Sequence, residues 1–186
     1  MTRLRGVLGL VGCLVLALTI AAVAPDPATD LRRRWSDADV GAWAQTPDVR
    51  ARVSAVAVVR SADRGYGDPL TSTQALVVTD VDASVRRQVV LFSHVYLLTA
   101  DGHEYEARPE FVSAGLGLTQ PGFTRHATLV FEVPPDRLAG AALVLDADAA
   151  SVDGYAAAVR VDLGLRAPVR VSPETGTPQP ATVTTS

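Results

Sequence analysis

Three aspartates lie close together in the stretch 146–154, and carboxylates are ligands that calcium prefers. Asp146, Asp148 and Asp153 supply the carboxylates, and calcium takes about six to eight oxygen ligands. An EF-hand loop needs an oxygen ligand at the position that Ala150 occupies here. The spacing therefore does not fit an EF-hand. Two interpretations stay open, a weak calcium site and a solvated loop between two strands.

The chain also contains three histidines, and a zinc site needs at least about three converging ligands. His94 and His103 flank the pair Asp101-Gly102, whereas His126 belongs to a different predicted strand. We expect these histidines to pack on the surface or on a sheet face rather than to bind a metal.

The stretch "LVVTDVDAS" resembles the aspartate motif of haloacid-dehalogenase-type phosphatases, in which an apolar strand precedes Asp-x-Asp. The resemblance implies a nucleophile at Asp80 and an acid-base group at Asp82. It also implies a parallel sheet with crossover helices and a downstream lysine, but the chain has no lysine and no pattern for such helices. We therefore expect Asp80 and Asp82 to point outward from a strand.

Other catalytic signatures are missing from the sequence. It has no G-x-S-x-G elbow, no P-loop and no G-x-G-x-x-G followed by a helix. We predict that the protein is not an enzyme and has no catalytic, cofactor-binding or metal-binding residue and no cofactor. The net charge of -3 argues against a nucleic-acid partner, which requires a basic face.

An uncharged apolar run extends over residues 6–24 and is long enough to cross a bilayer as a helix. Arg3 and Arg5 precede it and favour an inside N-terminus, whereas the arginines at 32–34 oppose that orientation. We predict a cytoplasmic stub at 1–5, a transmembrane signal anchor that contacts membrane lipid, and the remaining chain outside the membrane.

The same run has two alternative interpretations. Leu10 to Cys13 fit a lipobox, but a further apolar run follows the chain's single cysteine, which is the wrong order for a lipoprotein signal. Ala22-Val23-Ala24 is an A-x-A cleavage site, although Pro25 directly follows it. A signal-cleaved, secreted protein therefore stays open as the alternative to an anchored one.

The remaining sequence indicates an all-β domain at 48–166. Period-two alternation and β-branched runs predict about seven strands, and Asp101-Gly102 is a strong signal for a hairpin turn. We expect an antiparallel immunoglobulin-like β-sandwich, since no long amphipathic helix intervenes. Residues 25–47 are predicted to be a juxtamembrane linker, and the Pro- and Thr-rich residues 167–186 a disordered tail. The expected strands are 49–60, 74–83, 88–100, 103–107, 124–134, 139–147 and 155–165.

The order of these segments resembles a bacterial extracellular immunoglobulin-like domain of unknown function, found in actinobacterial lipoproteins and membrane-anchored surface proteins. The resemblance covers about residues 49–146 and has two parts. The matching residues are Tyr96, Leu98, Asp101, Gly102 and Tyr105, then Leu118, Pro121, Gly122, Phe131 and Pro134. It implies an extracytoplasmic β-sandwich and brings no catalytic residue.

Together these observations predict a non-catalytic extracytoplasmic binding module anchored to the cell membrane, with a protein partner in the cell envelope. The loops 64–69 and 111–123 are the candidate surfaces, with Phe111 and Phe123 expected to be exposed. The alternative is a secreted envelope protein with a weak metal-dependent or enzymatic site.

Overall fold

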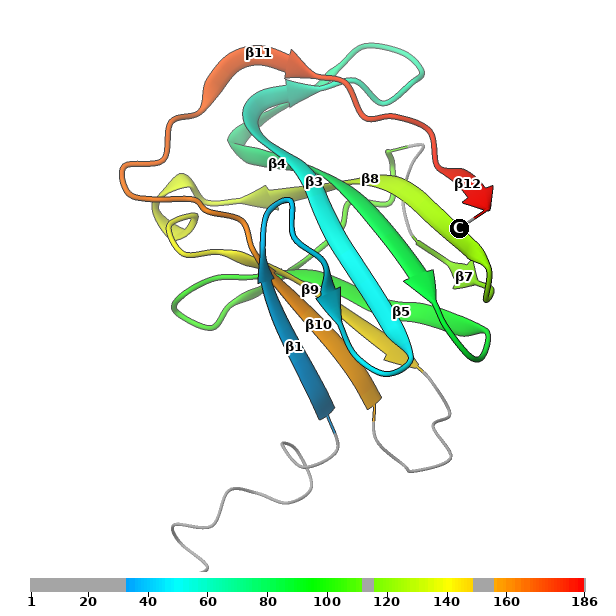
Figure 1. Ribbon diagram of the computed structural model, residues 1–186. Coiled ribbons are helices and arrows are strands. Elements are labelled where there is room, and N and C mark those ends of the chain that lie inside the picture. Colours follow the sequence, from blue (N-terminus) through cyan, green and yellow to red (C-terminus); the bar gives the residue numbers. More distant parts are fainter. Residues whose placement is uncertain (1–32, 112–115, 149–155, 186) are drawn as a thin grey trace, which may run out of the picture. The chain divides into compact units, whose positions relative to one another are not determined.

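The computed structural model describes residues 33–111, 116–148 and 156–185. These residues form two six-stranded sheets (Figure 1). Sheet A has the order β1-β10-β9-β5-β6, with β7 also paired to β5, and sheet B has the order β11-β3-β4-β8-β12, with β2 also paired to β3. The strands of sheet A are β1 (Arg33–Asp39), β5 (Val90–Leu98), β6 (Glu104–Glu106), β7 (Leu118–Thr119), β9 (Ala142–Asp148) and β10 (Ala156–Asp162). The strands of sheet B are β2 (Ala44–Gln45), β3 (Val49–Ala62), β4 (Leu70–Val85), β8 (Phe123–Val133), β11 (Ser172–Gly176) and β12 (Thr182–Thr185).

One apolar core lies between the two sheets, so the fold is an all-β sandwich. Sheet B contributes every second residue of its central strands, and sheet A contributes apolar residues of β5, β9 and β10. Each fully buried leucine or phenylalanine adds about 1.5–3 kcal/mol to the free energy of unfolding. Members of this core include Val77, Val81, Leu129, Phe131, Phe92, Leu97, Leu143, Leu145, Val159 and Val161.

All seven expected strands are present, as β3, β4, β5, β6, β8, β9 and β10. The predicted turn at Asp101-Gly102 joins β5 to β6, and Gly102 has a φ of 83°. The amide of Gly102 donates to the carbonyl of Thr99, so Ala100 and Asp101 are the central residues of the turn. Gly102 follows them in the left-handed conformation, which favours glycine. The count of about seven strands was too low, since the described residues add β1, β2, β7, β11 and β12.

A β-bulge in β3 changes which residues of that strand face the core. Val49 and Val53 are buried, as the alternation predicts, but Ala55 is exposed. The register with β4 shifts between Val53 and Ala55, so that Val56 and Val58 face the core instead. A single extra residue exchanges the two faces of a strand. Ala55 and Ala57 therefore leave the face that Val49 and Val53 share.

The outer face of sheet B carries a second, smaller apolar cluster. Leu76 and Val78 of β4 lie there with Val59 and Val130 of the neighbouring strands, and Phe111 covers them. The strand β4 is consequently buried on both faces, which explains its nearly continuous apolar run.

The C-terminal residues expected to form a disordered tail contain two strands. β11 pairs with β3 and β12 pairs with β8, at opposite edges of sheet B. The pairing of β11 with β3 is parallel, so the sandwich is not wholly antiparallel. Gly176, the last residue of β11, lies against Val59 and Val78 on the outer face. We call residues 172–185 the C-terminal strap. Backbone pairing orders a segment whose side chains bury little apolar surface.

The predicted linker 25–47 also differs from the structure in its described part. β1 lies at the edge of sheet A, where Asp37 pairs with Arg160 at 2.7 Å. β2 extends sheet B, and the amide of Gly41 donates to the carbonyl of Val53 at 2.8 Å. These residues belong to the sandwich.

The predicted stub at 1–5, the apolar run 6–24, Cys13 and the cleavage site at 22–24 lie outside the described residues. Among the residues that are described, no helix has the length and apolar character needed to span a membrane.

Candidate functional site

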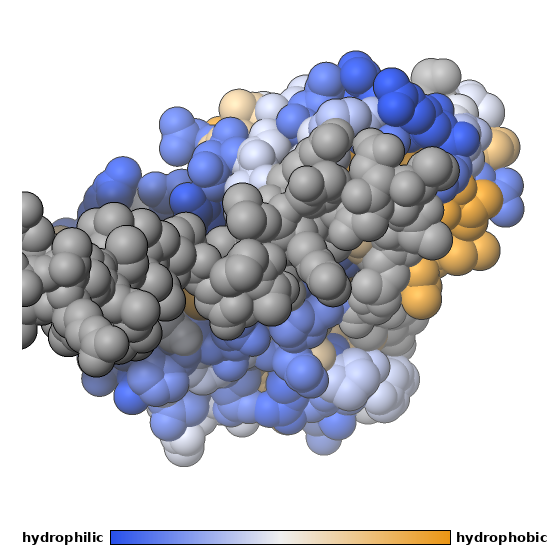
Figure 2. All heavy atoms as spheres, turned by 90° about the horizontal axis from the view of Figure 1, so that it is seen from below, coloured by the Kyte–Doolittle hydropathy of each residue, from blue (hydrophilic) through white to orange (hydrophobic). Residues whose placement is uncertain are grey.

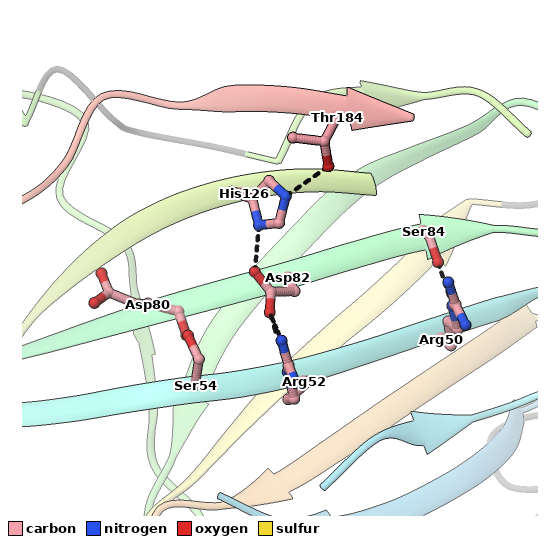
Figure 3. A network of polar contacts seen from close by, with 8 residues as sticks. All are labelled: Arg50, Arg52, Ser54, Asp80, Asp82, Ser84, His126 and Thr184. Carbon is pink, nitrogen blue, oxygen red and sulfur yellow. Dashed lines mark hydrogen bonds and ion pairs between the residues drawn. The ribbon is translucent and has the colours of Figure 1, made fainter. Parts of the chain in front are cut away.

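A row of polar side chains crosses the outer face of sheet B (Figure 3). Asp82 of β4 accepts hydrogen bonds from Arg52 of β3 at 2.5 and 3.0 Å, and its second oxygen lies 2.5 Å from Nδ1 of His126 in β8. Nε2 of His126 lies 2.9 Å from the hydroxyl of Thr184 in β12. We call Arg52, Asp82, His126 and Thr184 the polar row.

Strand register brings the polar row together. Asp82 is directly opposite Arg52 on one side and His126 on the other. The indole ring of Trp43 extends the row, because the guanidinium carbons of Arg50 and Arg52 lie 4.7 and 4.8 Å from its ring centre. Cation–π contacts at partly exposed sites contribute about 0.5–1 kcal/mol.

The two aspartates of the Asp-x-Asp motif point outward from the core, as expected, but they are not freely solvated. The side chain of Asp82 is only 8% exposed. Asp80 accepts a hydrogen bond at 2.6 Å from Thr128, whose hydroxyl also accepts one from the amide of Gln179 in the strap. Both oxygens of Asp82 are engaged, so this carboxylate links three strands.

Each histidine faces its own aspartate. The closest nitrogen-to-oxygen distances are 3.7 Å for His94 and Asp146, 3.1 Å for His103 and Asp101, and 2.5 Å for His126 and Asp82. His94 also stacks on Tyr96 in sheet A. Within the described part of the chain, no three His, Cys, Asp or Glu side chains converge on a point that could hold a metal.

The aspartate-rich stretch is only partly described. Asp146 is nearly buried and lies in β9 opposite His94. The side chain of Asp148 and the whole of Asp153 lie outside the described part, so the calcium prediction for this stretch stays a prediction.

Two surface clusters have altered pKa values. Arg108 donates hydrogen bonds to Glu110 and to Glu132; the Glu110 bond lowers that carboxyl's pKa and raises the pKa of Arg108. At the β5–β6 turn the hydroxyl of Thr99 donates to Asp101 and lowers its pKa. These clusters fix the Phe111 segment and the hairpin.

A groove of about 690 Å³ lies at the β1 end of sheet A. Asp37, Asp39 and Asp162 line it, together with Arg160 and the small residues around Gly102. Asp37 is paired with Arg160, and Asp162 accepts a hydrogen bond from the amide of Gly164. The groove is therefore acidic, but contacts within the chain already occupy two of its carboxylates.

A smaller pocket of about 230 Å³ lies between β7, β8 and β12. Its apolar walls are unusually exposed, with Leu118 at 55%, Phe123 at 39% and Val183 at 57%. We call these three residues the β7–β12 patch. Exposed Leu91 is opposite Leu118 in the β5–β7 pair and enlarges it. In Figure 2 hydrophobic atoms gather on the right-hand side of the face seen from below.

No strand of the described residues pairs with the outer edge of β12, which is therefore open within this part of the chain. β12 pairs with β8 on one side and ends the strand order of sheet B. All four of its residues are exposed. An open edge presents unpaired amides and carbonyls to a partner strand. This edge and the β7–β12 patch share Val183.

The loop 111–123 was predicted to expose two phenylalanines, and only one of them is exposed. Phe123 lies in the patch, whereas Phe111 is 1% exposed and covers the second apolar cluster. The prediction for Phe111 was wrong because the outer face of sheet B is itself apolar at Leu76 and Val78 and needs a cover.

Comparison with solved structures finds similar chains at low sequence identity. The yjhA protein from Bacillus subtilis aligns with a TM-score of 0.51 and 12% identity over 67% of this chain and 99% of its own. An uncharacterized β-sandwich protein from Clostridium difficile 630 gives 0.42 and 11%, over 69% of this chain and 95% of that one. A "putative lipoprotein" (ycdA) from Bacillus subtilis subsp. subtilis str. 168 gives 0.46 and 12%, over 64% and 38%.

The likeness to the yjhA protein shows a common fold and nothing about activity. No protein-family model and no curated protein matches this sequence.

Proposed function

We propose that this protein is a non-catalytic binding module that engages a protein of the cell envelope through the β7–β12 patch. One observation carries the proposal: large apolar side chains are exposed beside an open strand edge. Contiguous exposed apolar surface marks interaction sites, and an open edge pairs with an extended segment of a partner. The polar row supports a structural role for the most conspicuous ionisable groups, because Asp82 is fully engaged by its neighbours.

The module works outside the membrane in this proposal, anchored by the uncharged run 6–24 with Arg3 and Arg5 on the inner side. Its resemblance to immunoglobulin-like domains of actinobacterial surface proteins supports the same location. The acidic net charge of -3 favours a protein partner over a nucleic acid.

The partner surface is tested in living cells by site-specific photo-crosslinking. A photoreactive phenylalanine analogue at Leu118 is expected to give a discrete adduct that disappears when Val183→Asp is added. The matched control position is Tyr66, which is 56% exposed in the loop 64–69, outside the patch. Adducts that are identical from both positions, or unaffected by Val183→Asp, would refute the proposed surface.

The location is tested by fractionating cells and measuring the intact mass of the chain in each pool. A membrane-bound chain that retains Met1 or Thr2 supports the anchor. A released chain that begins near Ala22 contradicts it and identifies a secreted protein, and a lipid on Cys13 identifies a lipoprotein.

A further inference from the structure

Arg125 lines the pocket beside the β7–β12 patch, and it has no carboxylate partner among the residues that the structure describes. Its guanidinium lies against Gly117, where an added Cβ would be 3.5 Å from Nη2, and Nη1 is 3.5 Å from the carbonyl of Leu118. Its Nε is buried and makes no hydrogen bond to any described group. A guanidinium group held in this way is suited to bind a carboxylate, because the carboxylate accepts two parallel hydrogen bonds from it.

Thr119 also lines the pocket, but its hydroxyl is not open to an incoming group. The residue is 3% exposed, and its hydroxyl oxygen is buried without a hydrogen-bond partner in the described structure. Thr119 is opposite the fully buried Val90, whereas its neighbour Leu118 is exposed, so the threonine side chain faces the core. Arg125 therefore supplies the positive charge of this apolar pocket.

The size of the pocket restricts the occupant. At about 230 Å³ it is smaller than the roughly 300–1,000 Å³ of ordinary small-molecule sites. This volume suits one inserted side chain.

The strand geometry shows how a side chain of a partner segment reaches the pocket. Val183 is directly opposite Arg125 in the β8–β12 pair, so both side chains lie on the same face of sheet B. A strand added to the open edge of β12 would lie about 4.8 Å away, and its residue level with Val183 would face the pocket. Its neighbours two positions away would face the same side, over the apolar patch.

We propose that the pocket binds a glutamate side chain of an extended partner segment that pairs with β12, with apolar residues two positions before and after the glutamate. The glutamate carboxylate pairs with the terminal nitrogens of Arg125. This inference rests on the proposed function and names the chemistry that the binding module recognises.

The probe is a fluorescent peptide, Thr-Val-Thr-Glu-Thr-Val-Thr, blocked at both ends, with a peptide carrying Gln in place of Glu as its control. Affinity for the full chain in lipid nanodiscs is measured by fluorescence anisotropy. We expect the Glu peptide to bind about tenfold or more tightly than the Gln peptide, as for a charge-assisted bidentate pair. Raising the salt concentration should weaken this preference.

Variants distinguish peptide binding in the pocket from binding elsewhere on the surface. Arg125→Gln is expected to reduce the preference for Glu, whereas Arg125→Lys retains part of it. Arg166→Gln is the matched control, because this arginine is 78% exposed and pairs with Asp162 outside the pocket. Circular dichroism of each variant verifies the fold.

Equal affinity for the two peptides, or an equal loss in Arg166→Gln, would overturn the inference. So would displacement of the peptide by decanoate at an affinity above that of the peptide, since this would identify a fatty acid as the occupant. If crosslinks from Leu118 persist without any preference for Glu, the proposed function survives and this inference fails. If those crosslinks are also lost, both fail.

Discussion

Nδ1 of His126 lies 2.5 Å from Oδ1 of Asp82, at directly opposed positions of β8 and β4. The other oxygen of Asp82 accepts two hydrogen bonds from Arg52 on the opposite neighbour. One nearly buried carboxylate therefore joins three adjacent strands of sheet B. Removing its charge affects two partners at once.

The variant Asp82→Asn is expected to lower the free energy of unfolding by about 1–3 kcal/mol at pH 7, because the amide cannot satisfy both partners. Urea unfolding measures the change. The control is Asp37→Asn, whose side chain is 60% exposed in its pair with Arg160. Breaking that exposed pair should lower the free energy of unfolding by no more than about 1 kcal/mol. Equal losses would contradict a special role for Asp82.

The two phenylalanines of the loop 111–123 should respond differently to truncation. Phe111→Ala removes a buried ring from the second apolar cluster and is expected to cost about 3 kcal/mol or more. Phe123→Ala truncates a ring that is 39% exposed and should cost less than about 1 kcal/mol. Thermal unfolding of both variants measures the contrast. A larger loss for Phe123 would show that the burial of Phe111 is wrong.

Glu110 should titrate below its ordinary pKa of 4.5, because Arg108 donates a hydrogen bond to its ionised form. The folded chain then keeps this carboxylate charged at a pH where the unfolded chain binds a proton. The stabilisation is full above about pH 4.5 and is lost as the pH falls through the lowered pKa.

NMR titration of the Glu110 side chain provides the measurement, and Arg108→Gln is the informative variant. We expect the pKa of Glu110 to rise toward its ordinary value in that variant. The control is Arg64→Gln, since the charge of Arg64 is a minor cause of the shift. An unchanged pKa in Arg108→Gln would assign the shift to another cause.

The C-terminal strap should loosen when Gly176 is replaced by alanine. The new Cβ would lie 3.0 Å from a methyl group of Val78 and 3.2 Å from one of Val59, so one of these side chains or the strap must move. Overpacking of this kind costs about 1–2 kcal/mol. The amide of Asp63 reports the change, because it donates to the carbonyl of Gly176 at 2.8 Å.

Hydrogen exchange at Asp63 is expected to accelerate in Gly176→Ala. The control is Gly102→Ala, in which the strain comes from a φ of 83° and the added Cβ meets no neighbouring atom within 4 Å. That variant should destabilise the β5–β6 turn without a local effect on Asp63. Faster exchange at Asp63 in both variants would indicate global rather than local opening.

Local signals in the sequence predicted the elements that bury an apolar face. The alternation around Val49 and the Asp101-Gly102 turn each correspond to an observed element. The bulge at Ser54 was not predictable, because nothing in the residue types there shows where the register with β4 shifts. The strap was missed for another reason. Its order comes from hydrogen bonds to β3 and β8, and these leave no apolar period in its own residues.

The polar row could be predicted only in part. Alternation places Arg52, Asp82 and His126 on outward faces, and this much follows from the sequence. Their contact depends on pairings between positions 30 and 44 residues apart. Residue types do not determine such registers. The pocket at Arg125 was missed for the same reason, since Gly117 and Val183 reach it from different sheets.

The C-terminal strap has a consequence for the order of folding. Ribosomes deliver the chain from its N-terminus, so β3, β4 and β8 are all available before residues 172–185 have been made. Until then, part of the edge of β3 and the edge of β8 that later pairs with β12 have no partner strand. The nascent sandwich therefore has unpaired, aggregation-prone edges until residues 172–185 have been made, and the pairing of β11 and β12 then covers these edges of β3 and β8.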